Sequence, residues 1–458
     1  MARINRIPQS VHTHEGGKAK RCTAEAMLRR SVLSCLLWEN EFYEDGETIA
    51  NRIESLVRDV HPSTVAKLAV EARHEMKLRH APLLLATAMV KLPTHRSLVA
   101  DTLKQIVNRP DELSEFLAIY WKNGKCPVAN QVKIGLGNAF KKFNEYQLAK
   151  WNRSAEIKLR DVMRICHPKP DNSAQSDMWK RLLNDELVTP DTHEVAMSAK
   201  GADKGSEWTR LIEKNKLGGM AVLKNLRRME NDGVDRDMIK KAIRQMNTDY
   251  VLPYRFISAA KYAPALESDL EDSMIECLNT AEKMKGRTVL LVDVSASMHS
   301  QVSGKSEITR LDAACGLGIL LREICEDIDI YTFSRKLVRV PSRRGFALRD
   351  AIVNSQDHSS TYLGASVTAL SLPKDKSIRF EGMYRGHLTF DGQGLNPDRL
   401  IVISDEQSND KVPDPKSKGY MINVASNKYG VGYGAWTHCD GWSESVVRWI
   451  QELETEQF

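Results

Sequence analysis

The sequence has no long apolar stretch and no paired cysteine motif. No window of its 458 residues approaches the run of about 18 apolar residues that a membrane span requires. The opening stretch MARINRIPQS lacks the apolar core of an export signal. No CxxC occurs, and several of the eight cysteines lie in apolar helical patterns, where cysteine behaves as a small hydrophobic residue. We therefore expect a soluble cytoplasmic protein with reduced cysteines rather than a disulfide framework.

The positive charge is concentrated in one region. Residues 51–170 hold 21 Lys and Arg against 11 Asp and Glu, a net charge of +10. Residues 287–458 hold 20 basic residues against 22 acidic ones. The basic excess indicates an anionic partner for the first region.

The first part of the chain has the pattern of many short helices. Segments 22–38, 63–78 and 81–92 are rich in Ala, Leu and Met at helical spacing, and five prolines punctuate residues 62–127 at single-helix intervals. No convincing strand pattern occurs before residue 285. With 458 residues, two or three domains are expected. We predict that residues 1–285 form stacked helical hairpins, as in HEAT-type repeats.

The pattern changes after Gly286. Short β-rich runs alternate with helical ones, which favours a parallel sheet with helices on both faces, a doubly wound Rossmann-like domain over residues 286–458. Segment 373–396 is less regular and is predicted as a surface hairpin or loop insertion. The predicted strands are 287–293, 327–334, 398–405 and 419–426, and the predicted helices are 307–324, 345–353 and 443–454.

Oxygen-bearing side chains follow the ends of two of these strands. The run VLLVDVSASMHS places Asp293, Ser295 and Ser297 directly after a buried strand, and Asp405 closes the run LIVISD. Thr361 lies in a loop between them, before a helix. Ligands of open α/β sheets bind beyond the carboxyl ends of the strands. Hard oxygen donors suit Mg²⁺, with Mn²⁺ as an alternative.

Two other interpretations of this motif stay open. Ser295 and Ser297 can simply cap a turn. Phosphotransferases of the haloacid dehalogenase type also place an Asp at a strand end, but they need a second Asp where this chain has Ser295. No nucleophile–base pair and no phosphate-binding glycine loop occurs elsewhere, so we expect no enzymatic activity.

The five donors resemble the metal-ion-dependent adhesion site of von Willebrand factor A-like domains. That motif is Asp-x-Ser-x-Ser with a distant Thr and a distant Asp, and it maps onto this chain without departure. The resemblance implies that both serine hydroxyls bind the metal directly. It also implies an open coordination position for a partner's carboxylate. The implied metal ligands are Asp293, Ser295, Ser297, Thr361 and Asp405.

Basic residues also recur along segment 145–170. Leu159, Val162, Met163 and Cys166 have helical spacing and predict one apolar face, with a basic stripe on another. Arginines on rigid helices can hold phosphates, but a solvated charged face has the same pattern. The candidate RNA-binding residues are Lys141, Lys142, Lys150, Arg153, Arg160, Arg164, His167 and Lys169.

Helical repeats followed by a von Willebrand A-like domain resemble the TROVE module of the Ro autoantigen family. The stretches THEGGKA, EYQLAKW, ICHPKP and YRFISA are similar to that family, and the short chain is typical of a bacterial or phage member. The resemblance implies a HEAT-like ring whose outer basic surface binds small noncoding Y RNAs and whose hole takes single-stranded ends of misfolded RNA. Lys150 and His167 match basic positions of the family implicated in RNA contact, and Arg153 stands near another.

We therefore expect an RNA-binding scaffold that acts in noncoding RNA stability or quality control. Its expected partners are a small Y-like RNA, single-stranded ends of misfolded RNA and a ribonuclease, with no membrane. The alternative is a metal-dependent interaction module that grips an acidic protein, with an incidental basic surface. Nucleic acid that co-purifies with the protein would separate the two.

Overall fold

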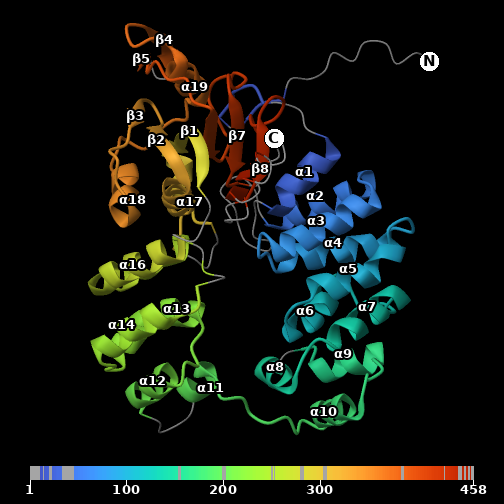
Figure 1. The fold of residues 1–458 in the computed structure, drawn as a ribbon. Helices are drawn as coiled ribbons and strands as arrows, with labels where there is room; N and C mark the ends of the chain where they lie inside the picture. Colours follow the sequence, from blue (N-terminus) through green and yellow to red (C-terminus); the bar gives the residue numbers. More distant parts are fainter. Residues whose placement is uncertain are drawn as a thin grey trace, which may run out of the picture. The chain divides into compact units, whose positions relative to one another are not determined.

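The computed structural model describes most of the chain as two compact units (Figure 1). The first unit comprises residues 1–46, 218–231 and 235–458, and the second comprises residues 47–217 and 232–234. The described residues are 11–13, 15–19, 23–33, 46–152, 156–198, 203–248, 251, 253–278, 283–302, 307–382, 386–425, 427, 429–441, 446–447, 450–451 and 454.

The second unit is helical throughout its described residues. Its helices are α2 (Gly46–Leu56), α3 (Pro62–His74), α4 (His80–Lys91), α5 (Val99–Ile106), α6 (Pro110–Tyr120), α7 (Asn130–Phe140), α8 (Glu145–Trp151), α9 (Leu159–Cys166), α10 (Ser173–Leu183), α11 (His193–Ser198) and α12 (Lys204–Glu213), with 3₁₀ turns η1 (Val57–Asp59) and η2 (Arg96–Leu98).

Local sequence explains where these helices start and how they pack. Pro110 occupies the first turn of α6, where its missing N–H costs nothing. Glu112 caps the same turn by accepting hydrogen bonds from the backbone N–H groups of Asn108 and Arg109, at 2.8 and 3.1 Å. Arg73 of α3 donates to Glu112 at 2.7 Å and so ties two helices together. Packing of α3 on α4, α4 on α6, and α5 on α7 gives the stacked-helix arrangement predicted from periodicity.

The first unit joins five helices to an α/β domain. Its elements are α1 (Ala24–Leu33), α13 (Gly219–Asn231), α14 (Arg236–Gln245), α15 (Pro253–Tyr262), η3 (Pro264–Leu266), α16 (Glu267–Leu278), β1 (Met284–Asp293), η4 (Ala296–His299), α17 (Arg310–Ile324), β2 (Cys325–Phe333), β3 (Leu337–Arg339), α18 (Gly345–Val353), α19 (Leu363–Ser371), β4 (Ser377–Gly382), β5 (Gly386–Asp391), β6 (Arg399–Ser404), β7 (Lys418–Asn423) and β8 (Thr437–Asp440).

The sheet is doubly wound, as predicted. Its strand order is β3-β2-β1-β6-β7-β8, and all neighbouring strands are parallel except the short edge strand β3. The four predicted strands correspond to β1, β2, β6 and β7, whereas β3 and β8 were not predicted. Segment 373–396 contains the antiparallel hairpin β4–β5. The predicted helix 443–454 lies largely outside the described residues.

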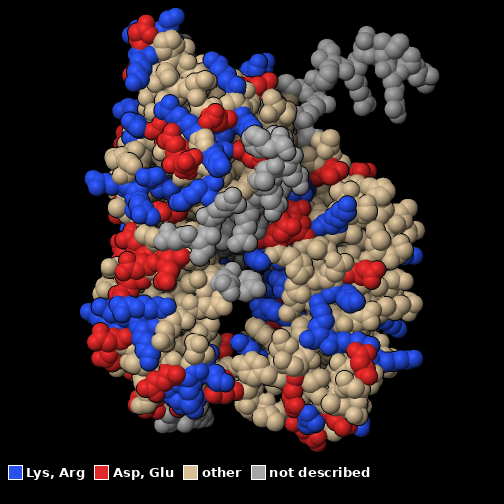
Figure 2. Space-filling model, viewed as in Figure 1, with Lys and Arg blue, Asp and Glu red and all other residues tan. Residues whose placement is uncertain are grey.

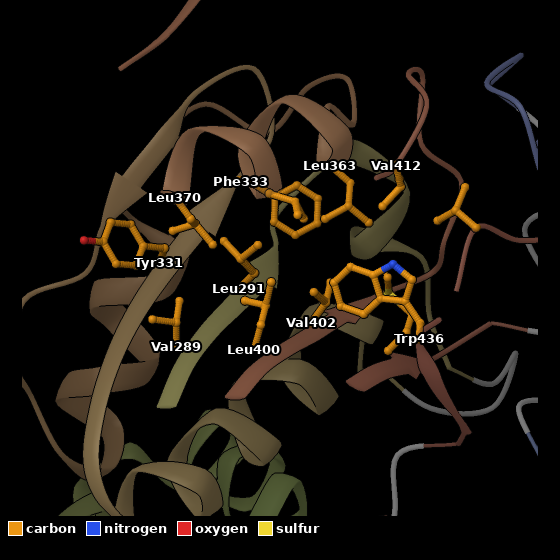
Figure 3. Packing of buried hydrophobic residues seen from close by; sticks show 13 residues of the cluster. Val289, Leu291, Tyr331, Phe333, Leu363, Leu370, Leu400, Val402, Val412 and Trp436 are labelled. Carbon is orange, nitrogen blue, oxygen red and sulfur yellow. The ribbon is translucent and has the colours of Figure 1, made fainter. Parts of the chain in front are cut away.

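Alternating strand residues build one face of the core (Figure 3). Val289, Leu291 and Val402 point to the same side of the sheet and pack against Leu363 and Leu370 of α19. On the other side, α17 packs against β1 and α18 packs against α17. The strands are therefore buried on both faces, which explains their nearly unbroken apolar runs.

Two expectations of the sequence concern the membrane and the cysteines. Within the described ranges, no helix has both the length and the apolarity of a membrane span. The six cysteines in these ranges are free thiols, namely Cys126, Cys166, Cys277, Cys315, Cys325 and Cys439. Cys22 and Cys35 lie outside the described residues.

Candidate functional site

The predicted metal ligands gather at the carboxyl end of the central strands. Asp293 is the last residue of β1 and Asp405 directly follows β6, and these two strands pair in parallel. The strand order reverses between β1 and β6, which is where open α/β sheets bind their ligands. All five predicted ligands are buried, with at most 8% of any residue exposed.

Hydrogen bonds fix the loop that follows β1. The Asp293 carboxylate accepts from the backbone N–H of Ser295 at 2.8 Å and from the Ser404 hydroxyl at 2.7 Å. The hydroxyls of Ser295 and Ser297 lie 3.3 Å apart. The backbone of Ala296 donates to the carbonyl of Ser359 at 2.9 Å, and thereby joins this loop to the one that carries Thr361.

The Thr361 loop is held by the residues that follow β6. The Thr361 N–H donates to the Asn409 side chain at 2.7 Å, and the Asn409 N–H donates to the Thr361 carbonyl at 2.8 Å. Asp410 accepts from Gly364 and Ala365 and so caps the first turn of α19. The three predicted ligand segments are thus tied to one another through backbone contacts.

The electrostatics of this cluster favour a cation. Burial and then the neighbouring Asp405 raise the pKa of Asp293 to about 7, because two carboxylates in a dry site resist ionising together. Within the described ranges, no three His, Cys, Asp or Glu side chains form a ligand group. A metal here would depend on the two carboxylates and three hydroxyls. Their hard oxygens fit Mg²⁺ or Mn²⁺, which would neutralise the paired negative charge when bound.

Arg310 is a charged neighbour that the sequence did not single out. Its guanidinium is buried, and Nη1 lies 3.7 Å from Oδ2 of Asp405. An arginine in the first turn of α17 is unfavourable for the helix dipole. That unfavourable placement was the available signal that Arg310 has another role.

A second buried charge cluster lies beside the predicted metal site. Arg30 of α1 pairs with Glu406, with Nη1 3.0 Å from Oε1, and both side chains are fully buried. His438 contacts the same carboxylate and has Nδ1 3.4 Å from Asp440. A side-chain carbon at Gly430 would lie only 2.2 Å from Glu406. The cluster therefore requires glycine at that position.

The charges in this cluster stabilise one another. Burial lowers the pKa of His438, but the Asp440 and Glu406 carboxylates outweigh burial and raise the pKa to about 9. Burial likewise raises the pKa of Glu406, yet Arg30 and His438 lower it to about 2. All the members are therefore charged at neutral pH.

The predicted RNA-binding residues lie around α8 and α9 of the second unit. Asn144 and Gln147 start α8 with a reciprocal capping pair at 2.9 and 3.0 Å. In α9, Leu159, Val162 and Met163 are buried while Arg164 is exposed, as the periodicity predicts. The helix ends before His167, which adopts a left-handed φ of 46° and is exposed beyond the last turn.

The basic residues of this region differ in how readily they could bind a phosphate. Lys141 pairs with Asp171, Lys142 donates to the Lys104 carbonyl at 2.6 Å, and Arg160 pairs with Asp185. The ammonium of Lys150 lies 5.8 Å from the ring of Trp151.

Two exposed residues are better placed to bind phosphate. Arg164 and Lys169 form no ion pair with any described residue. Arg153 lies outside the described residues. Arg164, Lys169 and His167 are thus exposed basic side chains near α9.

One further contact in this region was not predicted from the sequence. The guanidinium of Arg109, at the start of α6, lies 3.9 Å above the ring of Trp151. Nothing local in the sequence links these two positions. Figure 2 shows basic and acidic side chains interspersed on the viewed face, with acidic ones over α16.

Comparisons with known proteins agree with this architecture of helical repeats and a doubly wound α/β domain. The chain belongs to the TROVE domain family, whose profile matches residues 19–186 and 184–314. The crystal structure of the Ro (RSR) protein of Deinococcus radiodurans is similar, with a TM-score of 0.58 at 15% identity, over 92% of this chain and 97% of that one. No curated protein sequence matches.

These findings confirm the predicted family and fold class. The profile match ends at residue 314, so it does not reach Thr361 or Asp405. The von Willebrand-type metal site therefore stays a prediction. The loops described above bring its five predicted ligands to one end of the sheet.

Proposed function

We propose that this protein is a non-enzymatic, cytoplasmic RNA-binding scaffold. Membership of the TROVE family is the observation that carries the proposal. The net charge of +10 over residues 51–170 supports an anionic partner. We propose that the partner is a small structured, Y-like noncoding RNA bound around α8 and α9, that single-stranded ends of misfolded RNA are also bound, and that a ribonuclease joins the complex. The role would be noncoding RNA stability or quality control.

Structured RNA suits such a surface for physical reasons. Duplex RNA is recognised mainly through its phosphates and its shape. Exposed groups such as Arg164 and Lys169 can bind phosphates without reading bases. The predicted divalent cation would have a separate role at the carboxyl end of the sheet, where its open position would accept a carboxylate of a protein partner.

Co-purifying nucleic acid tests the proposal against a purely protein-binding function. The native protein should carry a high ratio of absorbance at 260 nm to 280 nm, and treatment with ribonuclease should lower it. Sequencing the bound RNA would then identify its class. A protein that is free of nucleic acid and binds no added structured RNA would favour the alternative, a metal-dependent module for an acidic partner.

A further inference from the structure

A basic pocket of about 410 Å³ lies between α13 and α15 of the first unit. Each helix contributes residues spaced i, i+3, i+4 and i+7, so each set occupies one face of its helix. Two stripes therefore face each other across the pocket. They consist of Lys224, Arg227, Arg228 and Asn231 on α13, and of Arg255, Ser258, Ala259 and Tyr262 on α15.

The lining of the pocket is basic. None of the described residues that line it is acidic, whereas four are Lys or Arg. Arg227 is exposed and Arg255 is half-buried, and neither forms an ion pair with a described residue. The Arg255 guanidinium lies 4.8 Å from the ring centre of Tyr254, which limits its freedom. Such preplaced guanidinium groups are suited to holding a phosphate.

The pocket also offers an apolar surface and an aromatic ring. Met220, Leu223 and Ala259 contribute apolar side chains to its lining. Tyr262 is 40% exposed. The nearby Glu307 carboxylate raises the pKa of its hydroxyl. An exposed ring beside basic residues is an arrangement on which nucleic-acid bases stack.

We propose that this pocket binds one unpaired nucleotide, with its base stacked on Tyr262 and its phosphate held by Arg227 and Arg255. The volume is that of a small-molecule site, so it admits one nucleotide and excludes a base-paired duplex. The inference rests on the proposed function only in taking an RNA strand as the source of the nucleotide. The pocket belongs to the first unit, whereas the surface around α8 and α9 belongs to the second.

The test uses the full chain, a fluorescently labelled short oligouridine and unlabelled UMP. Fluorescence anisotropy should show that Arg227→Glu and Tyr262→Ala each weaken oligouridine binding about tenfold, through lost phosphate attraction and lost stacking respectively. Tyr262→Phe keeps the ring and should bind within about twofold of the wild type. Lys241→Glu makes the same charge change at an exposed position of α14 outside the pocket and should have little effect.

Competition by UMP identifies the source of the nucleotide. Displacement of the oligouridine only by unlabelled oligouridine supports a strand in the pocket, and displacement by low UMP concentrations supports a free nucleotide there. Melting temperatures confirm that each variant is folded. If wild-type protein binds neither ligand, or if Arg227→Glu and Tyr262→Ala bind as the wild type does, the inference is overturned. A parallel titration with structured RNA distinguishes this result from failure of the α8–α9 surface.

Discussion

Arg30 and Glu406 form a fully buried ion pair, with 3.0 Å between Nη1 and Oε1, although they lie near opposite ends of the chain. The pair connects α1 to the loop that follows β6, where Asp405 belongs to the predicted metal site. Thr13 reinforces this connection, because its hydroxyl donates to the Ser408 carbonyl at 2.8 Å. The N-terminal segment is thus part of the α/β domain's structure.

Loss of this pair should destabilise the first unit strongly. Arg30→Met leaves Glu406 buried without its main partner, which typically costs about 3–5 kcal/mol and lowers the melting temperature by roughly 6–20 °C. Arg181→Met is a matched control, because Arg181 pairs with Glu145 on the surface and such pairs contribute at most about 1 kcal/mol. Calorimetry of both variants measures the difference. Equal small shifts would contradict the structural role of the Arg30 pair.

The same cluster predicts a pH dependence of stability. The pKa of His438 is about 9 in the folded protein against an ordinary value of 6.5. Its protonation therefore stabilises the fold fully below pH 6.5, and this stabilisation is lost as the pH rises through about 9. The loss is on the order of 3 kcal/mol for this buried group. His438→Gln should be less stable at pH 6 and show a flatter melting-temperature profile up to pH 9.5. Parallel profiles for the two proteins would exclude this role.

Mg²⁺ or Mn²⁺ should stabilise the α/β domain. A cation that binds only the folded state at 100 times its Kd adds about 2.7 kcal/mol. Asp293→Asn should abolish the shift without lowering the metal-free melting temperature, because it also removes the repulsion between Asp293 and Asp405.

The control for this experiment is Asp329→Asn. Asp329 is a carboxylate of the same sheet, but it pairs with Arg287 and Arg339. This variant should keep the full Mg²⁺ shift. Equal melting temperatures of the wild type in EDTA and in Mg²⁺ would refute the metal site.

Local sequence patterns predicted the strands whose apolar runs extend over several residues. The apolar runs that end at Asp293 and Asp405 identified β1 and β6, because strands buried on both faces have continuous apolar runs. Strands β3 and β8 have three and four residues, which is too short for a periodic signal.

The partners of buried charges could not be predicted in the same way. Within the run MLRRSVL, nothing distinguishes Arg30, which is buried, from the neighbouring Arg29. Only the tertiary fold brings Glu406 to Arg30. The same holds for Arg109, whose contact with Trp151 depends on how α6 and α8 pack.

Different residues of α9 are expected to serve folding and RNA binding. Leu159→Asp should impair folding, because Leu159 is almost fully buried. Arg164→Glu should leave stability within about 0.5 kcal/mol, because its side chain is exposed. Since Arg160 is already paired with Asp185, we expect Arg164→Glu alone to weaken RNA binding more than Arg160→Glu alone. Filter binding of the single variants, with circular dichroism as the folding check, measures both effects. A larger effect at Arg160 would contradict this ranking.

The salt dependence of structured-RNA binding is the decisive test of whether the surface around α8 and α9 binds RNA. We compare the wild type, the double variant Arg160→Glu with Arg164→Glu, and a charge-matched control, Lys214→Glu with Lys216→Glu, at two exposed positions. We expect the Arg160 and Arg164 double variant to bind at least about tenfold more weakly. Its slope of log affinity against log salt should fall by roughly 0.7–0.9 for each lost phosphate contact. The control should keep the affinity and slope of the wild type. Unchanged affinity and slope in the Arg160 and Arg164 double variant would show that this face is only solvated and does not bind RNA.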